Sequence, residues 1–571
     1  MRRFSMVAAA ATLAMIGMLV SVSPAFAETV LEVTPVKADA TPEIRAKLLE
    51  ARKNATAKNP YVVRVAPGSY TIGSALRLYS NTTLVLEGVS LRLAPLANCN
   101  MIRIGDPVDT QSGYYYKNIK VVGGDLDNTG HQNTCIKLAH AKNVSIEGVT
   151  MRNARSGHLM EVAGVAGLAV DGCTFRDQVQ APGAAIPEAL QIDVLNQKHM
   201  PSYRSEDLPT KNVVVANCTF VNVPRGIGSH TAVLNRYTKN MIIKNNTFSN
   251  LRSDAIRLMN YYDCRIEGNV IKGAPRGIAV YMGHVRGLYF GASLAKEGGV
   301  ASSASSAYKA PPKNQHITIK NNTITTSGID CYTGGANEGI FLCGYSFSRR
   351  LTKTAERDAI PKGNYYASGI KVVNNTIKTR GHGIRLDDAR NCTVKGNKIT
   401  FVGSRSTKAN YHGIYLLSGS NSNTIASNKI VKARSHGIFV ASKSKSNVVK
   451  GNTILAPGRY GISVQGAQAK TVSKNTITKP GSHGIVLHDA KGSMTVSKNK
   501  VTKSKKYAAF VDAKSKRYRM VFKGNKLSAT KKSNAVVAVE SGRVGVTGSK
   551  KFAVPKEKEN AEKSASFHKR R

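Results

Sequence analysis

Residues that can perform acid–base chemistry gather in one part of the chain, between residues 158 and 257. Glu161, Glu188 and Asp193 have carboxyl groups, which can act as general acid and general base on a bound substrate. The same part of the chain contains further polar and charged residues suited to binding: His158, Gln191, Arg225, His230, Asp254 and Arg257. A pair of carboxyl groups with such neighbours is what the hydrolysis of a glycosidic bond requires.

These residues lie within a repeated unit. The strings "GHGIRLDD", "YHGIYLLS", "SHGIFVAS" and "SHGIVLHD" repeat a Gly-Ile pair, and an Asn recurs in "NNTF", "GNKI" and "KNTI". The recurring residues are Asn246, Asn269, Asn322, Asn375, Asn397, Asn428, Asn452, Asn475, Asn499 and Asn525. Most of them are 22 to 26 residues apart, with one interval of 31 and two of 53, where the sequence has long insertions.

A unit of this length cannot bury its apolar face alone, but stacked on its neighbours it forms a continuous core of Ile and Val rows. Asn tolerates the left-handed backbone conformation that a tight turn needs. Stacked about 4.8 Å apart, the Asn amides can hydrogen-bond to one another in a ladder. Cys173 and Cys218 occupy the ladder position in earlier units. The repeat therefore predicts an all-β chain folded as a parallel β-helix.

The ends of the chain predict four regions. Residues 1–27 have a basic start, an apolar core and an Ala-Phe-Ala ending, which is typical of a secretory signal peptide. Residues 28–85 are expected to form the N-terminal cap and first strands, 86–545 the β-helix, and 546–571 a basic, disordered tail. The string "TPEIRAKLLEARKNATAK" (41–58) has a helical pattern, and we expect this helix to cover the first coil.

Because coils stack in register, equivalent positions form columns along the molecule. Two residues before each aligned Ile, the chain has His158, Glu188, Arg225, Asp254, Arg276, Glu338, His382, His412, His436, Tyr460 and His483. The position after the Ile includes Glu161, Gln191 and Arg257, and two residues further are Asp193, His230 and Tyr281. Strand alternation places these last two columns on the outer face. The histidines from His382 onward are expected to be one stacked, architectural row, and the charged positions before them the candidate site.

Two arrangements of the charged positions are open. Glu161 and Asp193 lie on adjacent coils about 8 Å apart, and Glu188 and Asp254 lie two coils apart at about 9 to 10 Å, distances that leave room for a water between acid and base. Insertions beside these coils are expected to form the walls of a groove. Alternatively, Glu188, Arg225 and Asp254 alternate in sign as in a structural charge ladder.

The composition restricts the partners. The formal net charge of +49 favours an anionic partner, and for an exported protein that means a cell-wall polymer or a host glycan, not nucleic acid. No apolar run after the signal is long enough to span a membrane. We expect a monomer that is secreted, extracellular or associated with the cell wall. The chain has no Trp, so Tyr281 is a candidate for stacking on sugar.

The string "VVRVAPGSYTIGSALRLYSNTTLVLEGVSLRL" followed by these coils resembles the right-handed β-helix superfamily of pectate lyases, polygalacturonases, tailspikes and mannuronan epimerases. This resemblance implies a right-handed solenoid with an N-terminal capping helix. It does not select a reaction, because the fold supports several chemistries. The Gly-His-Gly at 381–383 lacks the neighbouring residues of the polygalacturonase motif.

The first hypothesis is a secreted glycoside hydrolase that cleaves a polysaccharide with Asp193, Glu161 and Glu188. The alternatives are a polysaccharide lyase or uronate epimerase, and a non-catalytic glycan-binding surface protein. We expect no metal site and no cofactor, although the carboxylates of the site are also compatible with calcium, which takes oxygen ligands.

Overall fold

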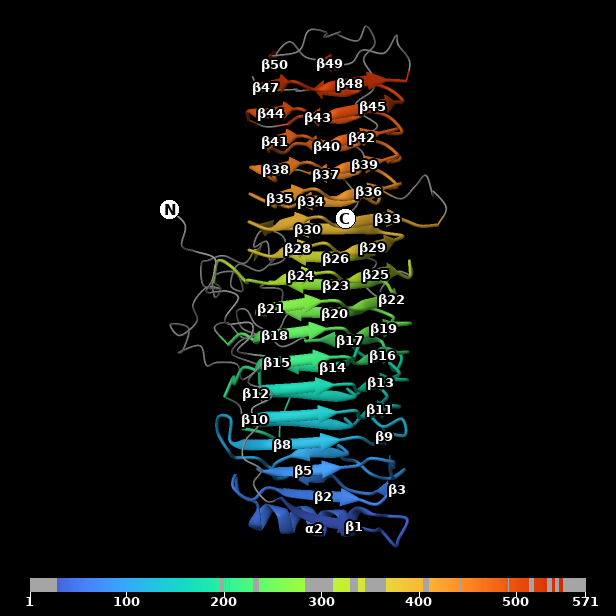
Figure 1. Cartoon of the computed structure of the whole chain (residues 1–571), viewed down its shortest axis with the longest axis vertical. Coiled ribbons are helices and arrows are strands. Elements are labelled where there is room, and N and C mark those ends of the chain that lie inside the picture. The colour runs from blue at the N-terminus through green and yellow to red at the C-terminus, as the bar shows by residue number, and fades with distance from the viewer. Residues whose placement is uncertain are drawn as a thin grey trace.

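The computed structural model describes residues 28–195, 200, 202–204, 206–229, 236–282, 312–328, 337–344, 366–403, 410–441, 443–490, 492–512, 518–530, 537–539 and 544–547. In these residues the chain winds as a stack of coils built from short parallel strands, which gives the elongated column in Figure 1. The predicted all-β class and parallel β-helix are confirmed. Residues 1–27, the predicted signal peptide, and residues 548–571 of the predicted tail lie outside the described residues.

Each coil contributes strands to three sheets that run along the molecule. Sheet 1 contains β10 (Ile136–Glu147), β12 (Met160–Asp171), β14 (Glu188–Asp193), β17 (Arg225–Gly228), β20 (Asp254–Met259), β23 (Arg276–Tyr281), β26 (Glu338–Cys343), β30 (His382–Asp387), β34 (Ile414–Leu417), β37 (Ile438–Val440), β40 (Ile462–Gln465) and β43 (Ile485–His488). Sheet 2 contains β15 (Lys211–Ala216), β18 (Lys239–Lys244), β21 (Tyr262–Glu267), β24 (Thr318–Lys320), β28 (Lys371–Val373), β32 (Thr393–Lys395), β35 (Thr424–Ala426), β38 (Asn447–Lys450), β41 (Ala469–Ser473), β44 (Met494–Ser497) and β47 (Tyr518–Lys523).

Sheet 3 supplies the third side of the coil. Its strands include β13 (Thr174–Arg176), β16 (Thr219–Val221), β19 (Thr247–Ser249), β22 (Val270–Ala274), β33 (Lys398–Phe401), β36 (Lys429–Val431), β39 (Thr453–Leu455), β42 (Thr476–Thr478), β45 (Lys500–Ser504) and β48 (Lys526–Ala529). The strands β10 and β12 are long enough to pair in both sheet 1 and sheet 2.

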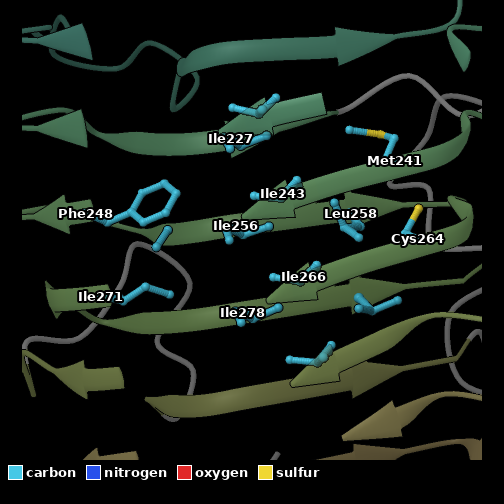
Figure 2. Close-up of a cluster of buried hydrophobic side chains, with 14 of the residues drawn as sticks. Ile227, Met241, Ile243, Phe248, Ile256, Leu258, Cys264, Ile266, Ile271 and Ile278 are labelled. Atoms are coloured by element: carbon cyan, nitrogen blue, oxygen red, sulfur yellow. The ribbon is translucent and has the colours of Figure 1, made fainter. Parts of the chain in front are cut away.

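The core consists of rows of identical or similar side chains that run from coil to coil. Figure 2 shows Ile227, Ile256 and Ile278 in one such row, and all three are fully buried. Phe220 and Phe248 stack in another, with ring centroids 4.7 Å apart and planes at 8°. Burial of each such side chain contributes about 1.5–3 kcal/mol, so every coil depends on its neighbours for most of its stability.

The predicted Asn ladder is present between sheets 2 and 3. The side-chain amide of Asn246 donates to the side-chain oxygen of Asn269 and to the Val215 carbonyl, both at 3.0 Å. The pattern continues without interruption to Asn525. Cys218 lies in the same row, and its backbone N–H donates to the side chain of Asn246 at 2.9 Å.

The prediction that the ladder Asn itself adopts the left-handed conformation is wrong. The left-handed conformation falls on the residue before the ladder Asn, as at Asn374 (φ 55°) and Lys498 (φ 54°). The ladder Asn is selected by its amide, because a buried turn leaves a backbone N–H and a carbonyl of neighbouring coils to be bonded.

The predicted N-terminal helix is α2 (Thr41–Asn54), which lies at the N-terminal end of the stack (Figure 1). It ends four residues before the predicted position 58, because Ala55 adopts an extended conformation. Ile44, Leu48 and Ala51 are buried, so the helix closes the core of the first coils.

Candidate functional site

The predicted charged column lies on sheet 1, at the N-terminal end of successive strands. Glu188 on β14 is paired in register with Arg225 on β17, and Asp254 on β20 is paired with Arg276 on β23. Glu338 on β26 stands in register with His382 on β30. We call the set His158, Glu188, Arg225, Asp254, Arg276 and Glu338 the charged column. The repeat placed all six residues correctly, because the distance to the aligned Ile is constant in each coil.

Ion pairs join the charged column from coil to coil. His158 Nδ1 is 3.8 Å from Glu188 Oε2, and Arg225 donates to the other oxygen of Glu188. Arg225 Nε lies 3.4 Å from Asp254 Oδ2, and Arg276 Nη1 lies 3.1 Å from Asp254 Oδ1. Arg276 Nε continues the series to Glu338 Oε2 at 2.7 Å. The arrangement is the charge ladder that alternation in sign suggested.

Sequence reasoning missed the end of this ladder. Arg385 donates to Glu338 at 3.1 Å and to Asp387 at 3.0 Å, so the series extends onto β30. Both residues stand in the aligned columns, but the Gly-His-Gly repeat around His382 concealed them. A search for charges of opposite sign on adjacent coils would have found them.

The central residues of the column are buried, and Asp254 and Arg225 favour the charged form of each other. Glu188 is 1% exposed and Asp254 is 3% exposed. Burial by itself would raise the pKa of the Asp254 carboxyl, but Arg276 and Arg225 outweigh it and hold the pKa below its usual value. Burial would likewise lower the pKa of Arg225, and Glu188 with Asp254 raises it instead. A carboxylate held in this way does not donate a proton near neutral pH.

The space between Glu188 and Asp254 is filled. We expected room for water between them, but Arg225 lies between the two carboxylates and contacts both. Gly228 makes this possible, because a Cβ there would lie 2.7 Å from Glu188 Cγ and 3.0 Å from Arg225 Cδ. The carboxylates are therefore joined through a guanidinium and do not form an open acid–base pair.

Glu161 and Asp193 lie where the register predicted. Glu161 on β12 is paired with Gln191 on β14, and Ala163 is paired with Asp193, so the two carboxyl residues are on adjacent strands. Lys137 Nζ lies 2.8 Å from Glu161, and the Gln191 amide donates to Asp193.

The insertion after Asp193 covers the outer face where we expected it to form a wall. Its residues Met200, Tyr203 and Leu208 pack on Ala139 and Ala163, which point outward from sheet 1. Asp193 is 2% exposed and Glu161 is 6% exposed beneath this cover. Glu161 and Asp193 lie on the outer face of sheet 1, as predicted. The insertion nevertheless buries both side chains.

A second buried polar group, which the sequence did not reveal, anchors this cover. Tyr203 accepts a hydrogen bond from Arg103 Nε at 2.8 Å, and His140 Nδ1 lies 3.1 Å from Asp109 Oδ2. Asp109 also forms a β-bridge with Tyr203. Arg103 and Tyr203 are 100 residues apart, which is why no local motif indicates the contact.

The remaining predicted binding residues have separate places. His230 lies outside the described residues. The Tyr281 hydroxyl accepts a hydrogen bond from Arg276 at 2.9 Å, and the Tyr281 ring meets Phe341 edge-on. Tyr281 is 8% exposed, so its ring is a packing element and not an open platform. Arg257 on β20 is partly exposed and contacts the Tyr281 ring at 5.3 Å.

The histidines after the charged column form the predicted stack. His412 lies parallel to His436 with centroids 4.9 Å apart, and His436 lies parallel to Tyr460 at 4.7 Å. Burial lowers the pKa of His412 and of His483 to about 3, so the rings are neutral at physiological pH. Their function is to support the strands, as the Tyr in the same row indicated.

Lysines line the edge of the C-terminal coils on both sides of the Asn ladder. We call the following residues the lysine edge: Lys395, Lys398, Lys429, Lys450, Lys474, Lys498, Lys500, Lys523 and Lys526. All of them are exposed, and each of six consecutive ladder positions from Asn397 to Asn525 has at least one beside it. With coils about 4.8 Å apart, the edge is about 24 Å long.

The lysines of the edge have no acidic partners in the part of the chain that the structure describes. In earlier coils the same row contains acids: Lys320 pairs with Glu267 at 2.9 Å, and Lys120 pairs with Glu147 at 2.8 Å. Among the described residues, none of the nine lysines of the edge forms an ion pair with a carboxylate. In the sequence, Asp489 is the sole acidic residue between 391 and 511. The sequence showed that this half is basic, but the alignment of lysines on one edge needed the register.

The described part of the chain contains no group of three or more His, Cys, Asp or Glu side chains placed to hold a metal ion. It also contains no helix that is long and apolar enough to cross a membrane.

Comparison with known proteins gives the class. The family model for a right handed beta helix region matches residues 108–346 and 362–546, so the chain belongs to this family. The plasmin and fibronectin-binding protein A of Streptococcus pneumoniae is 24% identical over 250 residues, which are 38% of this chain and 35% of that protein. The match therefore spans about a third of the length of that relative.

Two solved structures are similar in backbone. The S. pneumoniae surface adhesin PfbA covers 77% of this chain and 92% of its own, with 16% identity and a TM-score of 0.49. The tailspike of E. coli bacteriophage HK620, solved with a pentasaccharide, covers 89% and 76%, with 15% identity and a TM-score of 0.47.

Proposed function

We propose that the protein is an exported glycan-binding protein that holds an anionic polysaccharide along the lysine edge. The observation that carries this proposal is the row of exposed lysines without acidic partners in six consecutive coils. A linear polymer with one acidic group per repeating unit meets a new lysine at each coil, and the rigid solenoid maintains the spacing.

The contrast within the chain supports binding over simple solvation. A surface that only needs to be soluble can mix both signs of charge, as the N-terminal coils do with Glu267 and Lys320. The C-terminal coils keep the lysines and have few acids, so an anion from outside would relieve the mutual repulsion of the lysines. The curated relative is named for binding plasmin and fibronectin, which also supports a binding role for this chain outside the cell.

The proposal is tested with two variants of the full-length mature protein. One replaces Lys450, Lys474, Lys498 and Lys523 of the edge with Gln, and the other replaces Lys378, Lys432, Lys443 and Lys445, which lie outside the edge, in the same way. Both remove the same charge. We expect the edge variant to lose most of its co-sedimentation with insoluble polygalacturonate, and the control variant to keep it. Equal loss in both variants would show that binding depends on net charge and not on the lysine edge.

A glycoside hydrolase is the second candidate, favoured by Asp193 and Glu161. These two carboxyl residues lie on adjacent strands of the charged region, with Lys137 beside Glu161 and the Gln191 amide bonded to Asp193. Substrate would have to displace the cover formed by Met200, Tyr203 and Leu208. A lyase or epimerase would use the same place with a uronate substrate.

Product analysis on neutral and uronic polysaccharides separates these reactions. Hydrolysis gives new reducing ends, whereas a lyase gives unsaturated products, and a chelator tests for calcium. For the hydrolase we expect Asp193→Asn and Glu161→Gln each to lower turnover at least 100-fold, and Asp263→Asn, on the exposed side of β21, to leave it unchanged. No turnover of any substrate by the folded native protein would eliminate this candidate.

A further inference from the structure

The cations around the charged column have carboxylate partners with one exception. Lys137 contacts Glu161 at 2.8 Å, and Arg385 contacts Glu338 at 3.1 Å. Arg225 and Arg276 each contact two carboxylates. Arg257 has no ion pair or hydrogen bond with the described residues, and its Nε is a buried donor without an acceptor.

The surroundings of Arg257 leave its guanidinium available. The register places Ala279 beside it on β23, and the pairing of Ile227 with Ile256 places Gly228 beside it on β17. Neither neighbour has a long side chain. Arg257 is partly exposed, in contrast to Arg225 and Asp254. Burial and the charge of Arg225 lower the pKa of Arg257, and the charges of Asp254 and Glu188 do not outweigh them.

We propose that Arg257 is the receptor for one oxyanion group, a carboxylate or a sulfate, on a sugar residue bound at the outer face of β20. A guanidinium offers paired N–H donors that match the two oxygens of such a group. The guanidinium carbon lies over the Tyr281 ring, 5.3 Å from the ring centroid, so the ring supports the guanidinium on one face. The ligand class is an acidic oligosaccharide.

This site is separate from the lysine edge and does not depend on it. Arg257 lies on sheet 1 in the coil of Asp254, whereas the edge lies between sheets 2 and 3 in the coils from Asn397 to Asn525. The edge is a row of exposed charges that suits a long polymer. Arg257 is a single, partly buried donor group that selects one acidic sugar, and its contribution to binding is less sensitive to salt.

The experiment measures binding of tetrasaccharides to the full-length mature protein by calorimetry. The probes are a galacturonate tetramer, a heparin-derived sulfated tetrasaccharide and neutral maltotetraose. The variants are Arg257→Gln, Arg257→Lys and, as a matched control, Arg252→Gln, because Arg252 is an exposed arginine in the same coil. Thermal unfolding of each variant checks that it is folded.

We expect Arg257→Gln to weaken binding of at least one anionic tetramer tenfold or more, with Arg257→Lys intermediate and Arg252→Gln like the native protein. Which tetramer responds identifies the group as carboxylate or sulfate. Loss of polymer retention in the edge variant, with tetramer binding intact, would leave this inference standing. It is overturned if Arg257→Gln binds both anionic tetramers as the native protein does, if Arg252→Gln loses as much, or if the native protein binds neither.

Discussion

At the scale of single residues, the difference between Arg225 and Arg257 is informative. Both arginines belong to adjacent coils of sheet 1, yet Arg225 joins Glu188 to Asp254 and Arg257 has no carboxylate partner among the described residues. Removing one partner from a buried ion pair leaves a buried charge uncompensated, whereas removing a partly exposed cation that has no ion pair does not.

The first variant to test is therefore Arg225→Gln. It removes the guanidinium that Glu188 and Asp254 share in a buried site, so we expect a loss of about 3–5 kcal/mol in the free energy of unfolding. Arg257→Gln in the same measurement, chemical denaturation at neutral pH, should cost less than about 1 kcal/mol. A similar cost for both variants would contradict the ladder as described.

The sequence predicted the positions of these residues better than their environment. The repeat places Glu188, Arg225 and Asp254 in one column because each strand has the same offset from its Ile. It did not predict that Arg225 fills the space between the carboxylates, since that depends on side-chain length and on the missing Cβ of Gly228. Charges of opposite sign that alternate along one column therefore indicate a structural ladder more strongly than a catalytic site.

At the scale of elements, the histidine row makes the C-terminal coils sensitive to acid. The pKa of His412 and His483 is lowered to about 3, mainly by burial, and the pKa of His382 and His436 is also lowered. An unfolded histidine titrates near 6.5. Between these values the unfolded chain binds protons that the folded row does not. The contribution of the histidine row to stability is therefore fully present above about pH 6.5 and is lost as the pH falls toward 3.

We predict that the thermal midpoint falls markedly between pH 7.5 and pH 5. Below the pKa of the unfolded chain, each buried histidine lowers the free energy of unfolding by about 1.4 kcal/mol per pH unit. The double variant His412→Tyr and His436→Tyr should lose part of this dependence, because Tyr460 shows that the row accepts a tyrosine. Scanning calorimetry at both pH values measures the effect. An unchanged fall in the variant would assign the acid sensitivity to other groups.

Segments without a repeat were the hardest elements to predict. Met200 and Tyr203 belong to an insertion whose sequence has no period, so nothing indicated that it would lie across Ala139 and Ala163. The ladder from Asn246 to Asn525 was predictable because its spacing is regular. The assignment of the left-handed residue failed, since Asn occurs both at that position, as Asn374, and in the ladder, as Asn375.

At the scale of the whole molecule, the charge is divided along the solenoid. The N-terminal coils pair their charges across adjacent strands, as in Lys120 with Glu147 and Lys320 with Glu267. In the coils after Arg390 the lysine edge follows the Asn ladder, and among the described residues its lysines have no carboxylate partner. A straight, rigid scaffold with one basic edge is suited to a linear polyanion, since the backbone fixes the spacing of the charges.

The salt dependence of binding to soluble polygalacturonate tests this account most directly. Each lysine that neutralises an acidic group releases a bound counterion, so affinity should fall steeply as salt rises, in proportion to the number of lysines engaged. We predict a steep linear fall of log affinity with log salt for the native mature protein, and a clearly shallower one when Lys450, Lys474, Lys498 and Lys523 are replaced by Gln. The same slope in both proteins would contradict the lysine edge as the binding site.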